Sequence, residues 1–225
     1  NGLNAAQAGN DGAGGGGGIV NDSALQPVMP GSGGGGGGYT VQVSKNGLLG
    51  GTGGGVIKII VGATSTIYGV INANGGTGGV SYSNDGGSGG GGSGGSIWID
   101  TDAIAGNGII SANGGAGGRA NGGGAGGGGA GGRIAIYATS TSNFDFNSSI
   151  TVTGGSPGSN YGIAYSGGSG SKIFVKKNGG SSFNDLYVYN AGSPVIFSSD
   201  TTYRNIFAYN SAGIICNSAL TLSGT

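Results

Sequence analysis

The chain has 225 residues, of which 62 are glycine, and only 7% of its residues are charged. Eight lysines and arginines balance eight acidic residues, all of them aspartate, and histidine is absent. A chain with zero net charge and no basic cluster has nothing to attract nucleic acid or an anionic membrane, so neither is expected as a partner. The lack of net charge also removes repulsion between copies, which favours self-association.

Neither collagen nor simple disorder explains this glycine content. Collagen needs glycine at every third position, and the chain has no such period. Disordered linkers lack regular apolar segments, whereas short β-type runs such as VIKIIV, SIWID and RIAIY punctuate the glycine here. The sequence therefore predicts an ordered repeat protein.

Residues 1–180 form a glycine-rich region whose repeat is close to 39 residues. One family of strands reads Gly-x-Ile-x-Ile: Ile57 and Ile59, Ile97 and Ile99, Ile134 and Ile136, then Ile173 and Val175. A second family reads Ile-x-Ala-x-Gly-Gly: Ile71 and Ala73, Ile110 and Ala112, then Ile150 and Val152. Because side chains alternate across a strand, residues two apart share one face. These columns are the predicted core of a stacked sheet.

The opposite face of the first strand family carries no shared chemistry. Successive repeats place Lys58, Trp98, Ala135 and Phe174 there. A site built once per repeat would need the same group each time, whereas the residues that do repeat are isoleucine and glycine. The pattern indicates packing and backbone roles.

Glycine runs separate the strands, at Gly14–Gly18, Gly33–Gly38, Gly89–Gly92 and Gly126–Gly129. Ordering a glycine costs about 0.5–1 kcal/mol more than ordering an alanine. Such runs therefore either stay mobile or pack backbone against backbone with nearly every N–H and C=O paired. Polyglycine II, an extended helix with three residues per turn and no internal hydrogen bonds, allows that packing. Both an ordered bundle and mobile loops fit the sequence.

Residues 181–225 follow a shorter period of about 20 residues. Three residues of one copy recur in the next: Phe183, Leu186 and Asn190 become Tyr203, Ile206 and Asn210. This period matches one coil of a parallel β-helix, with asparagine at corners where its amide can form a ladder between coils. The predicted fold class is all-β, a parallel β-solenoid or β-helix with glycine-rich excursions. The helix is expected to continue beyond the chain.

Residues suited to catalysis or metal binding are sparse. Asp100 and Asp102 are two apart, which would suit a glycosidase pair or a calcium site. A turn after the SIWI strand is the preferred interpretation, since matching positions in other repeats are not acidic. Cys216 lies in the apolar run GIIC, where a buried inert thiol is expected. With no histidine and no second cysteine, we expect no metal, no cofactor and no catalytic residue.

Threonine and tyrosine supply the remaining candidates. Thr-x-Thr, a pattern of ice-binding solenoids, occurs at residues 64–66, 139–141 and 151–153, but the repeat of Ile97 lacks it. Several of the ten tyrosines cluster toward the C-terminus, where they can stack on sugars or partner proteins, or form aromatic ladders between coils. The ladder is the preferred interpretation, and Tyr187 and Tyr189 are the predicted ligand-contact residues.

The alternation of GGSIWI, GGRIAI and Ile-x-Ala-Asn-Gly-Gly resembles the glycine-rich solenoid segments of large microbial surface, adhesin-like or filament proteins. The last 40 or so residues resemble parallel β-helix passenger domains, and the glycine runs resemble the polyglycine II bundles of phage tail-tip adhesins. These resemblances cover most of the chain and include no catalytic motif. They imply a location outside the cell or on its surface.

The sequence as a whole predicts a structural protein without enzymatic activity, a self-associating segment of an extracellular filament, sheath or surface stalk. The main alternative is a cell-surface or phage-type adhesin that binds glycans. A β-helix enzyme that cleaves polysaccharides is the third. The start without methionine and the end within a repeat indicate part of a longer chain. Membrane insertion is not expected, because neither a signal peptide nor an apolar stretch of about 18 residues is visible.

Overall fold

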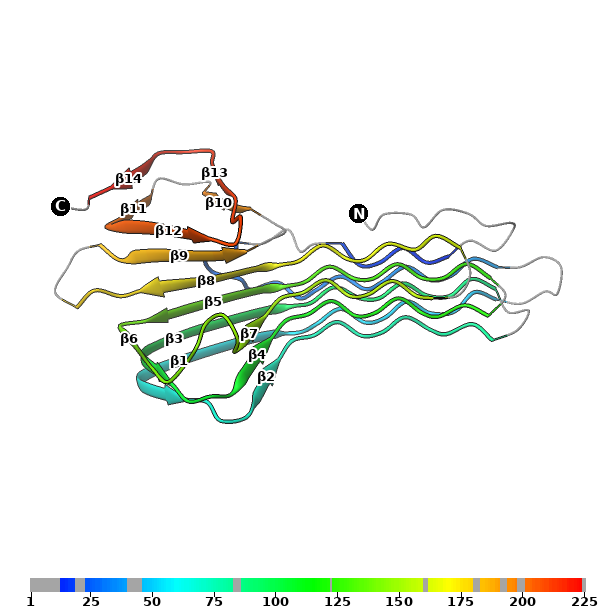
Figure 1. Ribbon diagram of the computed structural model, residues 1–225, viewed down its shortest axis with the longest axis horizontal. Helices are drawn as coiled ribbons and strands as arrows, with labels where there is room; N and C mark the ends of the chain where they lie inside the picture. Colours follow the sequence, from blue (N-terminus) through cyan, green and yellow to red (C-terminus); the bar gives the residue numbers. More distant parts are fainter. Residues whose placement is uncertain are drawn as a thin grey trace.

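The computed structural model describes residues 13–18, 23–39, 46–82, 86–121, 123–159, 162–179, 183–190, 194–197 and 201–223. Within these ranges the regular elements are β1 (Val56–Thr66), β2 (Val70–Asn72), β3 (Ser96–Ala105), β4 (Ile109–Ser111), β5 (Arg133–Ala138), β6 (Ser140–Ser142), β7 (Ile150–Thr151), β8 (Ser171–Lys176), β9 (Asp185–Asn190), β10 (Val195–Phe197), β11 (Thr201–Tyr203), β12 (Asn205–Tyr209), β13 (Ile214–Cys216) and β14 (Leu220–Leu222). In Figure 1 the strands gather at one end of the long axis, and undulating segments run side by side toward the other. The molecule is a β-solenoid of about three turns, which confirms the predicted all-β repeat fold.

Strands of successive repeats pair with one another to form the sheets. The largest sheet has seven strands in the order β1-β3-β5-β8-β9-β12, with β6 paired to β3. A three-stranded sheet has the order β2-β4-β7, and β10-β13 and β11-β14 are two-stranded. The first two glycine-rich repeats thus each add one strand to the largest sheet, the third adds β5 and β6, and all three add one strand to the three-stranded sheet.

The isoleucine columns predicted from the sequence lie in register. In the large sheet, in-register partners follow one another in the order Ile57, Ile97 and Ile134. In the three-stranded sheet the order is Ile71, Ile110 and Ile150. Both columns belong to one hydrophobic core, in which Ile97, Ile110 and Ile134 are fully buried. Burying each such side chain contributes about 1.5–3 kcal/mol, so these columns are a main source of stability.

The fourth member of the first strand family is shifted by one residue from the expected alignment. Ile173 and Val175 were expected to continue the column of Ile134, but β8 places Lys172 opposite Ile134. A shift of one residue moves every side chain to the other face. Phe174 therefore joins the first core, while Ile173 and Val175 join a second core. The expectation was wrong because three consecutive apolar residues in β8 show no alternation that would set the register.

The chain reverses direction between the two repeat regions. β8 and β9 form an antiparallel pair in which Lys176 lies opposite Asp185. β9 then pairs in parallel with β12, and Leu186 lies opposite Ile206, as the 20-residue period predicts. The fully buried apolar side chains of the C-terminal coils are Leu186, Val188, Val195 and Phe197. Parallel stacking thus holds within each region, and a hairpin joins two stacks of opposite direction.

An asparagine ladder links repeats of the glycine-rich region. Asn74 Oδ1 accepts a hydrogen bond from the Asn113 N–H at 2.7 Å, and Asn113 Oδ1 accepts one from the Thr153 N–H at 2.9 Å. The ladder expected between Asn190 and Asn210 cannot be followed in the same way, because the Asn190 side chain lies outside the described residues. Asparagine therefore links copies of the longer repeat, a role that was predicted only for the 20-residue repeat.

The glycine-rich segments form an ordered bundle, and its members are residues 13–18, 31–38, 47–55, 73–81, 86–95, 112–120, 123–132, 152–159 and 162–170. Their hydrogen bonds recur at every third residue: the N–H groups of Gly31, Gly34 and Gly37 donate to the carbonyls of Gly54, Gly51 and Leu48. A period of three is that of the polyglycine II helix. Of the two states that the sequence left open, these segments adopt the ordered bundle.

Residues 86–95 lie at the centre of the bundle. Their N–H groups donate in rotation to segments 31–38, 123–132 and 73–81, and their carbonyls accept in rotation from segments 47–55, 13–18 and 112–120. Every N–H from Gly87 to Gly95 and every C=O from Gly87 to Ser93 is paired, with N···O distances of 2.7–3.0 Å. A buried backbone group without a partner would cost about 1–3 kcal/mol. Complete pairing therefore offsets the entropy lost on ordering glycine.

Glycine is needed in the bundle because a side chain does not fit between the segments. A Cβ atom on Gly91 would overlap the carbonyl oxygen of Gly115. Glycine is not required in the bundle for its access to positive φ angles, since Gly106 and Gly162 are the only glycines with positive φ in the part of the chain that is described. The glycine runs thus reflect the close approach of neighbouring backbones.

Candidate functional site

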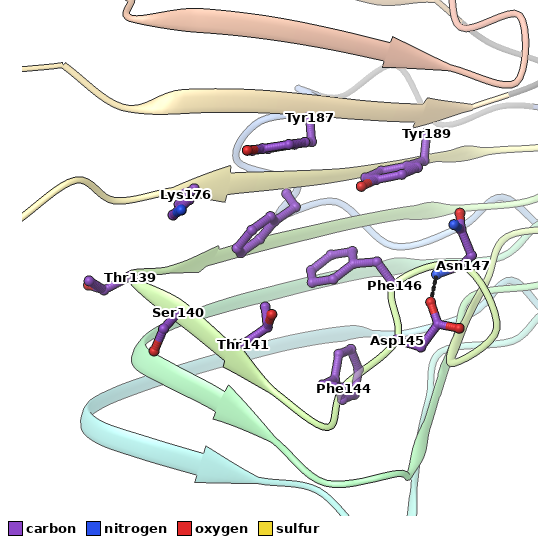
Figure 2. Close-up of a pocket in the computed structure, with 11 residues that line it drawn as sticks. Thr139, Ser140, Thr141, Phe144, Asp145, Phe146, Asn147, Lys176, Tyr187 and Tyr189 are labelled. Carbon is purple, nitrogen blue, oxygen red and sulfur yellow. Dashed lines mark hydrogen bonds between the residues drawn. The ribbon is translucent and has the colours of Figure 1, made fainter.

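A hollow of about 470 Å³ lies where β8 and β9 meet the loop between β6 and β7 (Figure 2). Its aromatic lining consists of Phe144, Phe146, Phe174, Tyr187 and Tyr189. The two tyrosines predicted to contact a ligand reach it together, because alternate residues of a strand share one face. The volume falls within the range of about 300–1,000 Å³ that is usual for small-molecule sites.

The loop at residues 143–149 is held in place by its own polar contacts. The Asp145 carboxylate accepts hydrogen bonds from the Asn147 N–H and the Ser148 hydroxyl, each at 2.8 Å. These bonds lower the pKa of Asp145, so its carboxylate is ionised at neutral pH. Lys172 Nζ donates to the carbonyls of Phe146, Asn147 and Ile150 at 3.2, 3.1 and 2.9 Å. The loop is therefore fastened to β8, which fixes Phe146 against the hollow.

Tyr187 and Tyr189 are part of an aromatic ladder between coils. Tyr187 stacks on Phe207 with ring centroids 4.7 Å apart, and Tyr189 stacks on Tyr209 at the same separation. On the β8 side, Phe174 lies 5.7 Å from Tyr187 and Phe146 lies 6.1 Å from Tyr189. Neighbouring rings thus occupy both sides of each tyrosine, as the preferred ladder interpretation expected. Tyr187 and Tyr189 therefore present their ring edges and hydroxyl groups to the hollow.

Polar side chains surround the aromatic lining: Thr139, Ser140, Thr141, Asp145, Asn147 and Lys176. They include one anionic and one cationic group. Burial raises the pKa values of Tyr187 and Tyr189, so both phenols stay protonated at neutral pH and can donate hydrogen bonds. The arrangement is suited to hydrogen bonding with a polar, uncharged ligand.

A second hollow of about 240 Å³ shares Asn147 and Tyr189 with the first. It continues past Tyr189 along β7 and is lined by Thr151, Thr153 and Lys172. Burial lowers the pKa of Lys172, and Asp145 partly offsets that effect. Because Asn147 and Tyr189 line both, the two hollows lie side by side, and together they are called the groove.

Asp100 and Asp102 lie within a strand, so the expected turn after SIWI is absent. β3 continues to Ala105 because its second half pairs with β1 on one side and β6 on the other. The Asp100 carboxylate forms an ion pair with Lys177 Nζ at 2.6 Å. It therefore has a structural partner in this sheet.

The Thr-x-Thr pairs do not line up between repeats. Thr64 and Thr66 of β1 lie opposite Ala103 and Ala105 of β3. A flat threonine array of the ice-binding kind is therefore absent from these strands.

Cys216 is exposed, and the expectation of a buried thiol was wrong. It ends β13, the outer strand of a two-stranded sheet, and its neighbour Ile215 is also 43% exposed. An apolar run indicates burial only when a further layer covers it, and no described strand lies beyond β13.

A buried carboxylate links the two C-terminal coils. Asp185 is 3% exposed and accepts hydrogen bonds from Arg204 Nε at 3.0 Å, Arg204 Nη2 at 2.6 Å and Asn205 Nδ2 at 3.0 Å. The Arg204 hydrogen bonds are the main reason that the pKa of Asp185 lies below its usual value.

We expect this carboxylate to make stability fall in acid. Because the pKa of Asp185 is lowered in the folded chain, the unfolded chain binds the proton more readily. The contribution of the Asp185 carboxylate to the free energy of unfolding is therefore complete above the usual aspartate pKa of about 3.9, and it is lost as the pH falls through the pKa of the folded state. Denaturant unfolding between about pH 6 and pH 2 should show a steeper loss for the natural chain than for Asp185→Asn. Asp102→Asn, at an exposed position, is the control and should keep the natural slope. Equal slopes for all three proteins would contradict the role of Asp185.

No family model matches the chain, and searches of curated proteins and of solved structures find no similar protein. Among the described residues, no three histidine, cysteine, aspartate or glutamate side chains gather as a metal site requires. The same residues include no helix that is long and apolar enough to cross a membrane.

Three loop residues of the hollow, Phe144, Asp145 and Phe146, were not predicted from the sequence. A signal for them was present. Phe144 and Phe146 are the only phenylalanines before β8, and they lie in NFDFN, which lengthens the connection between the two strands of the third repeat. An aromatic insertion in an otherwise regular repeat is typical of a segment with a role of its own.

Proposed function

We propose that the chain is a structural segment of an extracellular filament, sheath or surface stalk, without enzymatic activity. The observation that supports this most strongly is that the repeated residues are used in contacts between repeats. The isoleucine columns form the first core, the glycine runs form the bundle, and Asn113 bridges successive repeats. Residues that recur from copy to copy thus maintain the shape of the molecule.

The bundle has the properties of a rigid spacer. Segments of this type rise about 3.1 Å per residue, so residues 86–95 span roughly 30 Å. Their paired backbone groups are buried, and local opening would have to break hydrogen bonds to several neighbours at once. Stiffness of this kind suits a stalk or filament.

The outer strands of the large sheet support edge-to-edge association. β1 and β12 lie at its two edges, and neither pairs with a second strand among the described residues. Ile60 on β1 is 68% exposed and Tyr209 on β12 is 42% exposed. Unpaired edge strands readily accept a strand from another chain, and zero net charge does not oppose it.

Electron microscopy and sedimentation of the purified chain at increasing concentration test the proposal. We expect elongated, regularly associating particles. Ile60→Lys places a charge on the β1 edge and should raise the concentration needed for association about tenfold or more, the effect of roughly 1.4 kcal/mol. Ile163→Lys, at a position 62% exposed in segment 162–170, is the matched control and should associate normally.

Compact, monodisperse particles at every concentration would overturn the structural proposal. If both lysine variants associate like the natural chain, β1 is not the contact surface. These two results are distinguishable, because only the first removes association from the natural chain.

An adhesin of the cell-surface or phage type is the second candidate. The groove beside Tyr187 and Tyr189 favours it, since the polar side chains around it are suited to binding a ligand. A stalk can carry such a site, so the two functions are compatible.

A further inference from the structure

We propose that the groove between the 143–149 loop and β9 binds a neutral oligosaccharide through hydrogen bonds to its hydroxyl groups. The inference deepens the adhesin candidate and is independent of the structural role. Three observations support it: several side-chain hydroxyls line the groove, the faces of its two tyrosines are covered by neighbouring rings, and the larger hollow carries one charge of each sign.

The polar groups of the groove match those of a sugar. The side-chain oxygens of Thr139, Thr141, Tyr187 and Tyr189 make no hydrogen bond to any other described residue, although all four residues line the larger hollow. Each of these hydroxyls can donate and accept. A sugar hydroxyl does the same, so a ring carrying several of them can pair with several of these groups at once.

A sugar cannot stack on the faces of Tyr187 and Tyr189, because neighbouring aromatic rings cover both faces. Phe207 and Tyr209 lie against the tyrosines on one side, and Phe174 and Phe146 on the other. In Figure 2 the hydroxyls of Tyr187 and Tyr189 point in the same direction along the sheet. A ligand would therefore meet phenol groups at the ring edges, beside an apolar lining to which Phe146 and Phe174 belong.

The charges of the groove favour a neutral ligand. Asp145 and Lys176 contribute one charge of each sign to the larger hollow. Lys172 lines the smaller hollow, but its ammonium group already donates to three carbonyls of the loop. An acidic sugar or a phosphate would find one cation, Lys176, that makes no side-chain hydrogen bond or ion pair to another described residue, and it would lie near the Asp145 carboxylate, which repels it.

The length of the groove favours more than one sugar unit. The hollow of about 240 Å³ lies beside the hollow of about 470 Å³, and Tyr189 and Asn147 line both. A chain of sugars extending along β7 would pass Thr151 and Thr153. The Thr151 hydroxyl accepts a hydrogen bond from Asn113 Nδ2 and keeps its proton to donate, whereas the Thr153 hydroxyl donates to Asn113 Oδ1 and can still accept. The ligand class is thus a linear oligosaccharide.

Titration of the full chain, followed by NMR, with cellohexaose, maltohexaose, xylohexaose and chitohexaose tests the inference, with hexagalacturonate as the acidic comparison. We expect at least one neutral hexamer to shift the resonances of Tyr189 and Thr141. Tyr189→Phe removes the hydroxyl and keeps the ring, and should weaken binding about fivefold, the effect of one hydrogen bond. Tyr209→Phe is the matched control, because it changes the same ladder at a position outside the groove, and its affinity should be unchanged.

Three results would overturn the inference: no neutral hexamer binds, only hexagalacturonate binds, or Tyr209→Phe weakens binding as much as Tyr189→Phe. None of them bears on the structural proposal, which is judged by the association of the natural chain. The filament and the groove are therefore tested separately.

Discussion

Gly91→Ala is expected to destabilise the protein by about 3 kcal/mol or more. The new Cβ would overlap the carbonyl oxygen of Gly115 and lie 2.8 Å from that of Ala116. Both groups belong to backbone, so no flexible side chain can move aside. A shift of residue 91 would also strain the hydrogen bonds of its N–H to Gly127 at 2.9 Å and of its carbonyl to Gly17 at 2.7 Å. Denaturant unfolding followed by circular dichroism measures the loss.

Gly168→Ala is the matched control for this substitution. Gly168 lies in the same bundle, where its carbonyl accepts a hydrogen bond from Gly131, but a Cβ there would have no atom within 4 Å. Neither Gly91 nor Gly168 has a positive φ. The control should be neutral or stabilising by about 0.4–1 kcal/mol, because alanine restricts the unfolded chain. Equal losses at the two positions would contradict close backbone approach as the reason for glycine.

Ile134→Ala is expected to cost about 2–5 kcal/mol of stability. Ile134 is fully buried in the middle of the large sheet, between Ile97 of β3 and Lys172 of β8. The strands on both sides are held in place by their own hydrogen bonds, so the surrounding core cannot collapse fully into the cavity. The same unfolding experiment measures the effect.

Ile163→Ala provides the comparison for the core substitution. It makes the same chemical change at a position that is 62% exposed, and a surface change of this kind usually stays within about 0.5 kcal/mol. A loss below about 1 kcal/mol for Ile134→Ala would mean that the isoleucine column is not the main core.

Much of the repeat architecture could be predicted from sequence. The columns of Ile57, Ile97 and Ile134 came from spacing alone and lie in register. The pairing of Leu186 with Ile206 likewise followed from the 20-residue period. Periodicity works here because each repeat contacts mainly its neighbours, so a residue and its partner are one period apart.

The candidate site was predicted only in part. Tyr187 and Tyr189 were chosen because aromatic residues cluster near them, and the structure brings both to the hollow. Asp145 and Phe146 were missed, since they lie about 40 residues earlier in an interruption of the repeat. Periodicity identifies residues that recur, and these residues occur once. The loop comes close to β9 because Lys172 fastens it to β8 and the antiparallel hairpin places β9 beside β8.

The sequence by itself determined the repeat periods, the residues that form the columns and the need for small residues between them, because these are properties of local spacing and side-chain size. The tertiary structure decided how far these patterns extend. It set the one-residue shift of β8, the antiparallel turn into β9 and the exposure of Cys216. Apolar runs such as those in β8 and β13 fit either face of a sheet equally well, so only the neighbouring strands select one. The groove also depends on tertiary structure, because the residues that line it come from segments far apart in the sequence that share no repeat pattern.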